Sequence, residues 1–106
     1  MIEVTFSINL QGQYTKVELT GHADYADHGT DIVCAAVSAA VYGISNAIIV
    51  KSKARQLVND EKDRFTIINN DTSCGITYHL LDTLLIMVNG ISEQYPDNVS
   101  VTKLIK

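Results

Sequence analysis

The feature that most constrains this chain is a run of nineteen residues without a charged side chain, Ile32–Val50. Its length approaches the roughly 20 apolar residues that cross a bilayer. Polar residues such as Ser38, Ser45 and Asn46 interrupt the run, however, and it follows segments with the pattern of strands, whose apolar face needs a partner. The run therefore predicts a buried helix of a globular domain rather than a membrane span.

Two strands are predicted before this run. Apolar and polar residues alternate from Ile2 to Leu10, which is typical of a strand with one face in the core. The turn signal at 11–13 (QGQ) connects it to a second alternating segment, Thr15–Thr20, so the two predict a β-hairpin. The next segment, Gly21–Thr30, has two glycines and no apolar period and is predicted to be a loop.

Two long helices are predicted. The first follows Asp31, a good N-cap, and should run from Ile32 to about Lys53. Because this helix is apolar nearly all round, the second helix or a partner subunit must cover the side that faces away from the sheet. The second helix should run from about Ser73 or Cys74 to Tyr95. Its expected buried face consists of apolar residues at helical spacing: Ile76, Leu80, Leu84, Met87, Val88 and Ile91.

Further strands follow both helices. Leu57–Lys62 is typical of a short strand or a turn, whereas Arg64–Asn69 and Val99–Ile105 are predicted strands. The resulting order ββαβαβ predicts a single domain, residues 1–106, of the α/β (α+β) class. In this fold two long helices pack on a mixed β-sheet.

Composition and charge exclude several classes of protein. Hydrophobic residues make up 46% of the chain and charged residues 19%, which is typical of a folded domain rather than a disordered tail. The formal net charge of -4 provides no basic field to attract the phosphates of nucleic acid. Two cysteines are too few to staple a secreted fold, and the N-terminus lacks the pattern of a signal peptide. We therefore expect a cytoplasmic protein that binds neither nucleic acid nor a membrane.

Residues able to do chemistry gather around the predicted loop and helix start. His22 follows the second strand, and Cys34 is the third residue of the helix that Asp31 caps. The partial positive charge at a helix N-terminus favours a thiolate, and a histidine within reach favours it further. Cys34 and His22 are therefore a candidate nucleophile and general base, and free N–H groups at the helix start are candidates to hold an oxyanion.

Each of these residues also has an alternative interpretation. Cys34 lies among apolar residues, which is typical of a packed core thiol. The Asp31 carboxylate opposes a thiolate unless the amides of Val33 or Cys34 hold it away from the sulfur. His22, His28, Asp31 and Cys34 are also four possible zinc ligands, but their spacing matches no familiar zinc site.

The second cysteine, Cys74, lies near the start of the second helix. The nearest histidine along the chain, His79, belongs to the same helix and lies roughly 140° round from it, so the two cannot easily meet. We therefore expect Cys74 to be a packed thiol and His79 a helix-surface or core histidine.

Two segments, GHA at 21–23 and GTDIVCAAVS at 29–38, closely resemble those of the Prp ribosomal-processing cysteine proteases. The resemblance implies a small cytoplasmic homodimeric endopeptidase that removes a short N-terminal extension from ribosomal large-subunit protein twenty-seven. It implies Cys34 as the nucleophile and His22 as the base, without a cofactor or metal. It also implies four supporting residues in the site: Asp31, Ser38, Gly21 and Gly29.

The roles of several residues stay open. Ser38 is one helical turn after Cys34 and either lines the substrate groove or bonds a helix carbonyl. Asp24, Asp27 and Asp31 are each candidates for a third catalytic group. The alternative function is a non-enzymatic ribosome-assembly or scaffold protein in which Cys34 is a buried structural residue.

Overall fold

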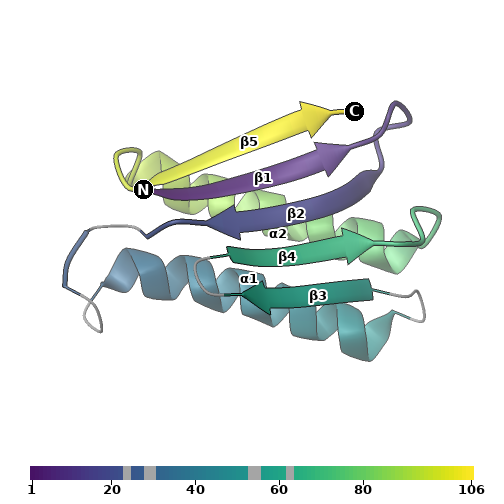
Figure 1. The fold of residues 1–106 in the computed structure, drawn as a ribbon, viewed down its shortest axis with the longest axis horizontal. Helices are drawn as coiled ribbons and strands as arrows, with labels where there is room; N and C mark the ends of the chain where they lie inside the picture. Colours follow the sequence, from purple (N-terminus) through teal and green to yellow (C-terminus); the bar gives the residue numbers. More distant parts are fainter. Residues whose placement is uncertain (23–24, 28–30, 53–55, 62–63) are drawn as a thin grey trace.

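In the computed structural model of the chain, the alternating N-terminal segment forms an inner strand of a β-sheet, next to one edge (Figure 1). Strand β1 (Ile2–Ile8) pairs antiparallel with β2 (Tyr14–Thr20), which confirms the predicted hairpin. The structure describes residues 1–22, 25–27, 31–52, 56–61 and 64–106, with the segment 56–61 described by its backbone.

Three further strands complete the sheet. β4 (Arg64–Asn69) pairs antiparallel with β2, and β3 (Gln56–Glu61) pairs antiparallel with β4. β5 (Val99–Ile105) runs parallel to β1, which gives the strand order β3-β4-β2-β1-β5. The predicted fold class and the predicted order ββαβαβ are confirmed, and the ambiguous segment at 57–62 is resolved as the additional edge strand β3.

Two helices pack on one face of this sheet (Figure 1). α1 (Ile32–Lys51) connects β2 to β3, and α2 (Gly75–Gln94) connects β4 to β5. α1 contacts β3, α2 contacts β5, and the two helices contact each other between them. The domain therefore has two layers, with a core between the helices and a single face of the sheet.

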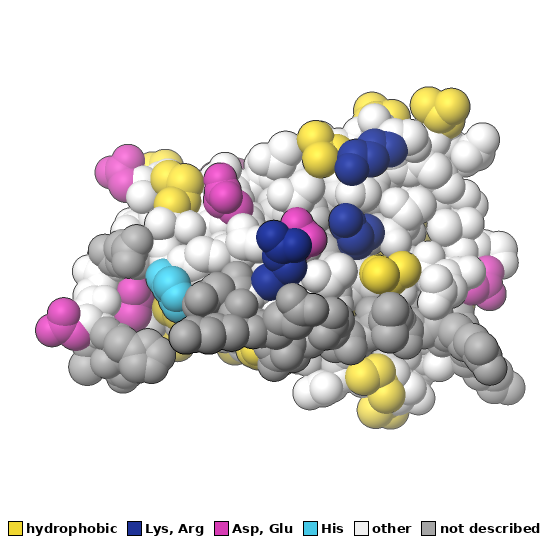
Figure 2. All heavy atoms as spheres, viewed as in Figure 1, with side chains coloured by type: hydrophobic (Ala, Val, Ile, Leu, Met, Phe, Trp, Pro, Cys, Tyr) yellow, Lys and Arg dark blue, Asp and Glu magenta, His cyan; other side chains and the backbone are white. Residues whose placement is uncertain are grey.

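The other face of the sheet is open to solvent. On the described part of this face, Figure 2 shows mainly backbone and uncharged polar side chains, with lysine and arginine side chains near the middle. Glu18 of β2 and Arg64 of β4 approach each other there to 3.9 Å. Alternation along β1 and β2 permits this arrangement, because each second residue points away from the core.

The core is built from the inner face of the central strands and one side of α1. Val4 and Phe6 of β1 are completely buried. The buried apolar stripe of α1 has the spacing of one helix face and consists of Val33, Val37, Ala40, Val41, Ile44 and Ile48. Burial of this stripe fixes the rotation of α1 about its axis, and with it the direction of every other side chain on the helix.

α2 buries part of the predicted face: Leu84 and Val88 are buried, and Leu80 and Ile91 are partly buried against the core. Ile76 and Met87, which belong to the predicted face, are 50% and 42% exposed. The buried residues are Thr77, Leu81, Leu84, Leu85 and Val88. The buried side is therefore the predicted face rotated toward Thr77, Leu81 and Leu85. The polar residue on the buried stripe, Thr77, has its hydroxyl 2.9 Å from the hydroxyl of Ser52, so its burial is compensated.

α1 is long and apolar enough to cross a membrane by length and composition alone. In this fold one side of it packs into the core, as predicted for a core helix. The opposite side stays exposed although it is apolar: Ile32 is 58% exposed and Val50 is 80% exposed. Contact with α2 therefore does not cover this side of α1. Of the two predicted ways to cover it, α2 or a partner subunit, the partner subunit stays a prediction.

Gly21 ends β2 at a point where the chain passes the N-terminus. Its φ is +84°, and a Cβ atom built on it would lie 2.3 Å from the carbonyl oxygen of Met1. Gly12, in the hairpin turn, also has a positive φ of +79°, but a Cβ atom there would meet nothing within 4 Å. Glycine is thus required at position 21 for two reasons, conformation and space.

We expect Gly21→Ala to destabilise the domain more than Gly12→Ala. Both substitutions place alanine in the left-handed region, at a cost of about 1–2 kcal/mol. Only at Gly21 does the new methyl group meet backbone, which adds about 1–3 kcal/mol of overpacking. Urea denaturation of the two variants measures the difference, and equal losses in the free energy of unfolding would contradict the close approach at Met1.

Candidate active site

Asp31 caps α1 through one of its two carboxylate oxygens. The residue has an extended backbone, and its Oδ1 atom accepts a hydrogen bond from the N–H of Cys34 at 2.9 Å. The predicted N-cap is therefore confirmed. Because the amide of Cys34 holds this carboxylate, Asp31 has a structural role as the N-cap of α1.

The second carboxylate oxygen of Asp31 holds the preceding loop. Oδ2 accepts hydrogen bonds from the N–H groups of Tyr25, at 3.0 Å, and Ala26, at 3.3 Å. The bond from Cys34, followed by the two bonds from the loop, favours the ionised carboxylate and lowers the pKa of Asp31 below its usual value. A single side chain thus joins the loop after β2 to the first turn of α1.

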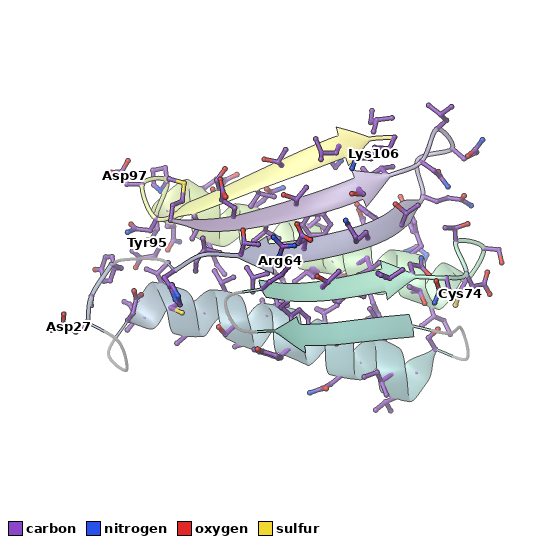
Figure 3. The ribbon with its side chains drawn as sticks, viewed as in Figure 1. Asp27, Arg64, Cys74, Tyr95, Asp97 and Lys106 are labelled. Carbon is purple, nitrogen blue, oxygen red and sulfur yellow. The ribbon has the colours of Figure 1, made fainter. Side chains whose placement is uncertain are left out.

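An aromatic contact holds the same loop to the C-terminal end of α2. The rings of Tyr25 and Tyr95 meet edge to face, with centroids 5.3 Å apart. Tyr95 is the C-cap of α2 and donates its N–H to the carbonyl of Ile91. Figure 3 shows Tyr95 at the same end of the molecule as Asp27 of the loop. Periodicity and motif spacing carry no signal for this contact, because the two tyrosines belong to separate segments.

Cys34 and His22 belong to elements that meet at one end of the domain. The end of β2 and the start of α1 lie at the same end of the sheet (Figure 1), and His22 follows β2 directly after Gly21. His22 is exposed, and Cys34 is half-buried against the edge of the core. Ser38 is half-buried one turn further along α1. Cys34 as a residue is therefore partly exposed rather than enclosed in the core.

Cys34 lies in the first turn of α1, beside the N–H groups of the helix start. Cys34 is the third residue of the helix, where the helix dipole favours negative charge. The N–H of Cys34 is already occupied by Asp31. An oxyanion at this site must therefore use N–H groups other than that of Cys34.

Cys74 lies at the opposite end of the molecule from Asp27 (Figure 3). It is the N-cap of α2 and is half-buried, with its sulfur 3.3 Å from the hydroxyl of Ser52. Hydrogen bonds from Ser52 and then from Thr77 lower the pKa of the Cys74 thiol to about 7. Cys74, expected to be a packed thiol, thus has a lowered pKa, which sequence spacing did not indicate because Ser52 reaches it from the end of α1.

Several candidate residues lie outside the described part of the chain. These are Gly29, His28 and Asp24, so their predicted roles stay predictions. Within the described ranges, no group of three or more histidine, cysteine, aspartate or glutamate side chains is arranged to hold a metal ion. The four-ligand zinc hypothesis includes His28 and is therefore not tested as a whole.

The chain is similar in sequence to proteins of one described family. Residues 1–100 match the sequence model of a family described as cysteine protease Prp. A ribosomal processing cysteine protease Prp from Staphylococcus aureus is 38% identical over 101 residues, which cover 93% of this chain and 95% of that protein. A protein of the same description from Bacillus subtilis is 31% identical over 108 residues, covering 96% of both chains.

Solved structures show the same fold. The essential ribosomal processing protease Prp from S. aureus, in complex with a covalently linked product peptide, superimposes with a TM-score of 0.94 at 35% identity. This similarity covers 97% of the present chain and 99% of the other. A structure of that protease with a substrate peptide gives a TM-score of 0.88 at 34% identity, with the same coverage.

We expect Asp31→Ser to release the loop while leaving α1 formed. Serine also caps helices, so it can replace the bond to Cys34, but its one short hydroxyl cannot also reach Tyr25 and Ala26. Amide hydrogen exchange at Tyr25 and Ala26 should accelerate, with little change in helicity. The control is Asp97→Ser, which removes an exposed carboxylate at the same end of the molecule (Figure 3). Unchanged exchange at both loop amides in Asp31→Ser would contradict the bridging role.

The same substitution should change the dependence of stability on pH. Because folding lowers the pKa of Asp31, its ionised carboxylate stabilises the folded state fully above the pKa of the unfolded chain. This contribution is lost as the pH falls through the lower pKa of the folded state. Melting curves of wild type and Asp31→Ser should therefore differ at neutral pH and converge in acid.

Proposed function

The chain belongs to the Prp family of cysteine proteases, and on that premise we propose that Cys34 is its nucleophile and His22 its general base. The observation that carries the proposal is the half-buried Cys34 in the capped first turn of α1. His22 follows β2 at the end of the sheet where α1 begins. The residues that hold this loop are Asp31, through its carboxylate, and Tyr95, through its ring.

The proposed reaction is an acyl transfer. The Cys34 thiolate attacks the carbonyl carbon of the scissile bond, and the carbonyl oxygen takes up the negative charge. When the tetrahedral intermediate collapses, the C–N bond breaks and the imidazolium of His22 gives its proton to the leaving amine. A thioester to Cys34 remains. Water then loses a proton to His22 and attacks the thioester, which releases the new carboxylate and restores the thiolate.

Two other residues support this reaction without taking part in bond changes. Asp31 holds the helix start and the loop together, and both of its oxygens are bound to backbone N–H groups. This arrangement favours a structural role for Asp31 over that of a third catalytic group. Ser38 lies one turn from Cys34, where a half-buried hydroxyl can line the groove that receives the peptide.

The proposed substrate is the N-terminal extension of ribosomal large-subunit protein twenty-seven, cut in the cytoplasm. The relatives are described as ribosomal processing proteases, and one is seen with a substrate peptide. The charge of this chain also fits a basic ribosomal protein. The formal net charge is -4, and Asp27 and Asp97 lie at the end of the molecule that carries the candidate site (Figure 3).

The proposed assembly is a homodimer formed through the outer face of α1. This exposed side has no charged residue and includes Ile32, Ala35, Ala36, Ala39, Gly43 and Val50. An apolar helix face of this length is costly to leave in water, and its small residues permit close approach by another helix. A second copy offers the same face, as a two-fold interface requires.

The cleavage experiment uses a peptide that spans the extension and its junction, with product masses as the readout. We expect wild type to give two products and Cys34→Ser to lose at least about a thousandfold in rate while it still binds the peptide. Cys74→Ser is the matched control because it removes the other half-buried cysteine, and it should cut at close to the wild-type rate. Cleavage by Cys34→Ser, or its loss in a folded Cys74→Ser, would show that the nucleophile is wrongly assigned.

Alkylation separates the two cysteines independently of cleavage. Because the pKa of Cys74 is about 7, iodoacetamide should label it readily near neutral pH, so each thiol must be followed in the variant that lacks the other. His22→Ala should slow the labelling of Cys34 and leave that of Cys74 unchanged. Equal slowing at both thiols would indicate a general structural change instead of a lost base.

Sedimentation velocity tests the dimer. Wild type at micromolar concentration should have the mass of two chains, and Ala39→Glu should shift it to one, because the substitution places a charge in the middle of the outer face of α1. Leu104→Glu serves as control, since Leu104 is an exposed apolar residue of β5 on the open side of the sheet. A wild-type monomer with native helicity would refute this interface.

A further inference from the structure

A pocket lies at the end of the sheet opposite the candidate active site. It opens between α2 and the ends of β1 and β5, beside the hairpin turn, and has a volume of about 360 Å³. This volume is within the range of small-molecule sites. Neither Cys34 nor His22 lines this pocket, so a ligand here would be bound independently of the proposed protease activity.

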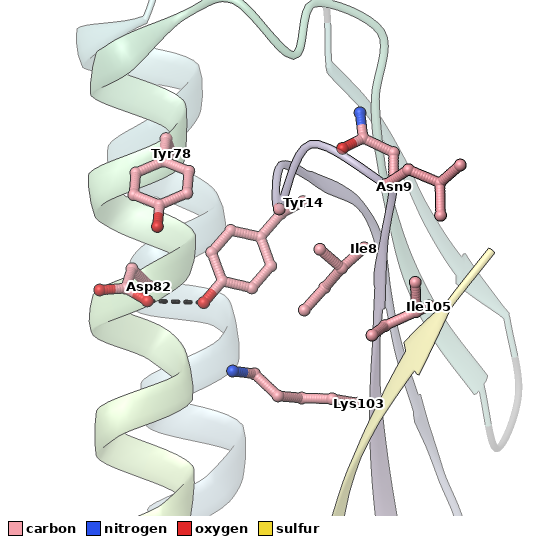
Figure 4. Close-up of a pocket in the computed structure, with 9 residues that line it drawn as sticks. Ile8, Asn9, Tyr14, Tyr78, Asp82, Lys103 and Ile105 are labelled. Carbon is pink, nitrogen blue, oxygen red and sulfur yellow. Dashed lines mark hydrogen bonds between the residues drawn. The ribbon is translucent and has the colours of Figure 1, made fainter.

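The helix wall of this pocket carries a fixed carboxylate. Asp82 of α2 accepts a hydrogen bond from the hydroxyl of Tyr14 at 2.5 Å (Figure 4). Tyr14 is only 3% exposed, and its ring packs against that of Tyr78 with centroids 5.3 Å apart. Burial, followed by the bond to Asp82, raises the pKa of Tyr14 and keeps the phenol protonated as a donor. The Tyr14 donor therefore orients the Asp82 carboxylate at the edge of the pocket.

The sheet wall presents the opposite charge. Lys103 of β5 is paired in register with Phe6, so it lies on the face of the sheet that the helices cover. Figure 4 shows its amino group extending toward α2, on the side of the pocket where Asp82 and Tyr14 lie. In the described part of the chain no ion pair involves Lys103. A cationic and an anionic group thus line one pocket without forming an ion pair with each other.

Apolar side chains form the rest of the lining. Ile8 is almost fully buried at the base of the pocket, whereas Ile105 and Leu10 are 72% and 83% exposed at its mouth. The inner face of β5 is covered by α2 at Val99 and becomes exposed toward Ile105, so the pocket is the place where the helix no longer covers the strand. An occupant here gains apolar contact as well as two charged ones.

We propose that this pocket binds a small zwitterion with an apolar side chain, of the class of free α-amino acids. The ammonium group of the ligand meets Asp82, its carboxylate meets Lys103, and its side chain lies against Ile8 and Ile105. A ligand with a single charge pairs with either Asp82 or Lys103 and leaves the other of these two groups without a partner. An alternative role for Lys103 is to protect the edge strand β5 from pairing with another chain, as lysines on edge strands do.

The test is a methyl NMR titration with three probes of similar shape. L-leucine carries both charges, isocaproate carries only the carboxylate, and isopentylamine carries only the ammonium group. L-leucine should give saturable shifts at the methyl groups of Ile8 and Ile105, with Ile32 at the other end of the molecule as an unaffected reference. Both single-charge probes should bind at least about tenfold more weakly, as expected for the loss of one hydrogen bond to a charged group.

Substitutions assign the contacts. Asp82→Asn and Lys103→Gln should each weaken leucine binding at least about tenfold. The matched controls are Glu93→Gln, on the same helix, and Lys16→Gln, on the open face of the sheet, and both should leave it unchanged. The proposal is overturned if leucine gives no saturable shift, if isopentylamine binds as well as leucine, or if the shifts occur at Ile32. Self-association of Lys103→Gln with unchanged leucine affinity would assign Lys103 to edge protection and equally overturn it.

Discussion

The structure depends above all on the burial of one side of α1 against the sheet. The stripe from Val33 to Ile48 faces the inner side of the strands, and each fully buried valine or isoleucine contributes about 1.5–3 kcal/mol relative to exposure. A helix held by such a stripe cannot rotate about its axis. The position of Cys34 at the edge of the core and the exposure of the opposite side of α1 are both consequences of this packing.

At the candidate site, the fixed position of α1 also fixes the loop that precedes it. Asp31 uses one oxygen for the helix and the other for the loop, so the loop that follows His22 is bound to the same turn that carries Cys34. Tyr95 holds the loop from the other side through Tyr25. Gly21 allows the chain to leave β2 closely past Met1. The candidate site is therefore supported by hydrogen bonds from backbone N–H groups to the Asp31 carboxylate.

Covering a five-stranded sheet with only two helices has consequences away from this site. The outer face of α1 stays apolar and exposed, which favours association with a second copy. At the other end, α2 no longer covers the last residues of β5, and Lys103 and Asp82 line the pocket that results. Cys74 also illustrates the effect of packing, because Ser52 at the end of α1 acidifies a thiol that belongs to α2.

The sequence by itself determined the elements of this protein and the location of its candidate chemistry. Alternation specified β1 and β2, the charge-free run specified α1, and the segments around His22 and Cys34 indicated the family. These signals are local, because strand and helix periods and N-caps involve residues close along the chain. Tertiary structure decided the rotation of α2 about its axis, since Leu81 and Leu85 flank the predicted apolar face and only contact in the folded domain buries them while Ile76 and Met87 stay exposed. It also decided the contact of Tyr25 with Tyr95 and the ionisation of Cys74, because each depends on residues that meet only after the chain has folded.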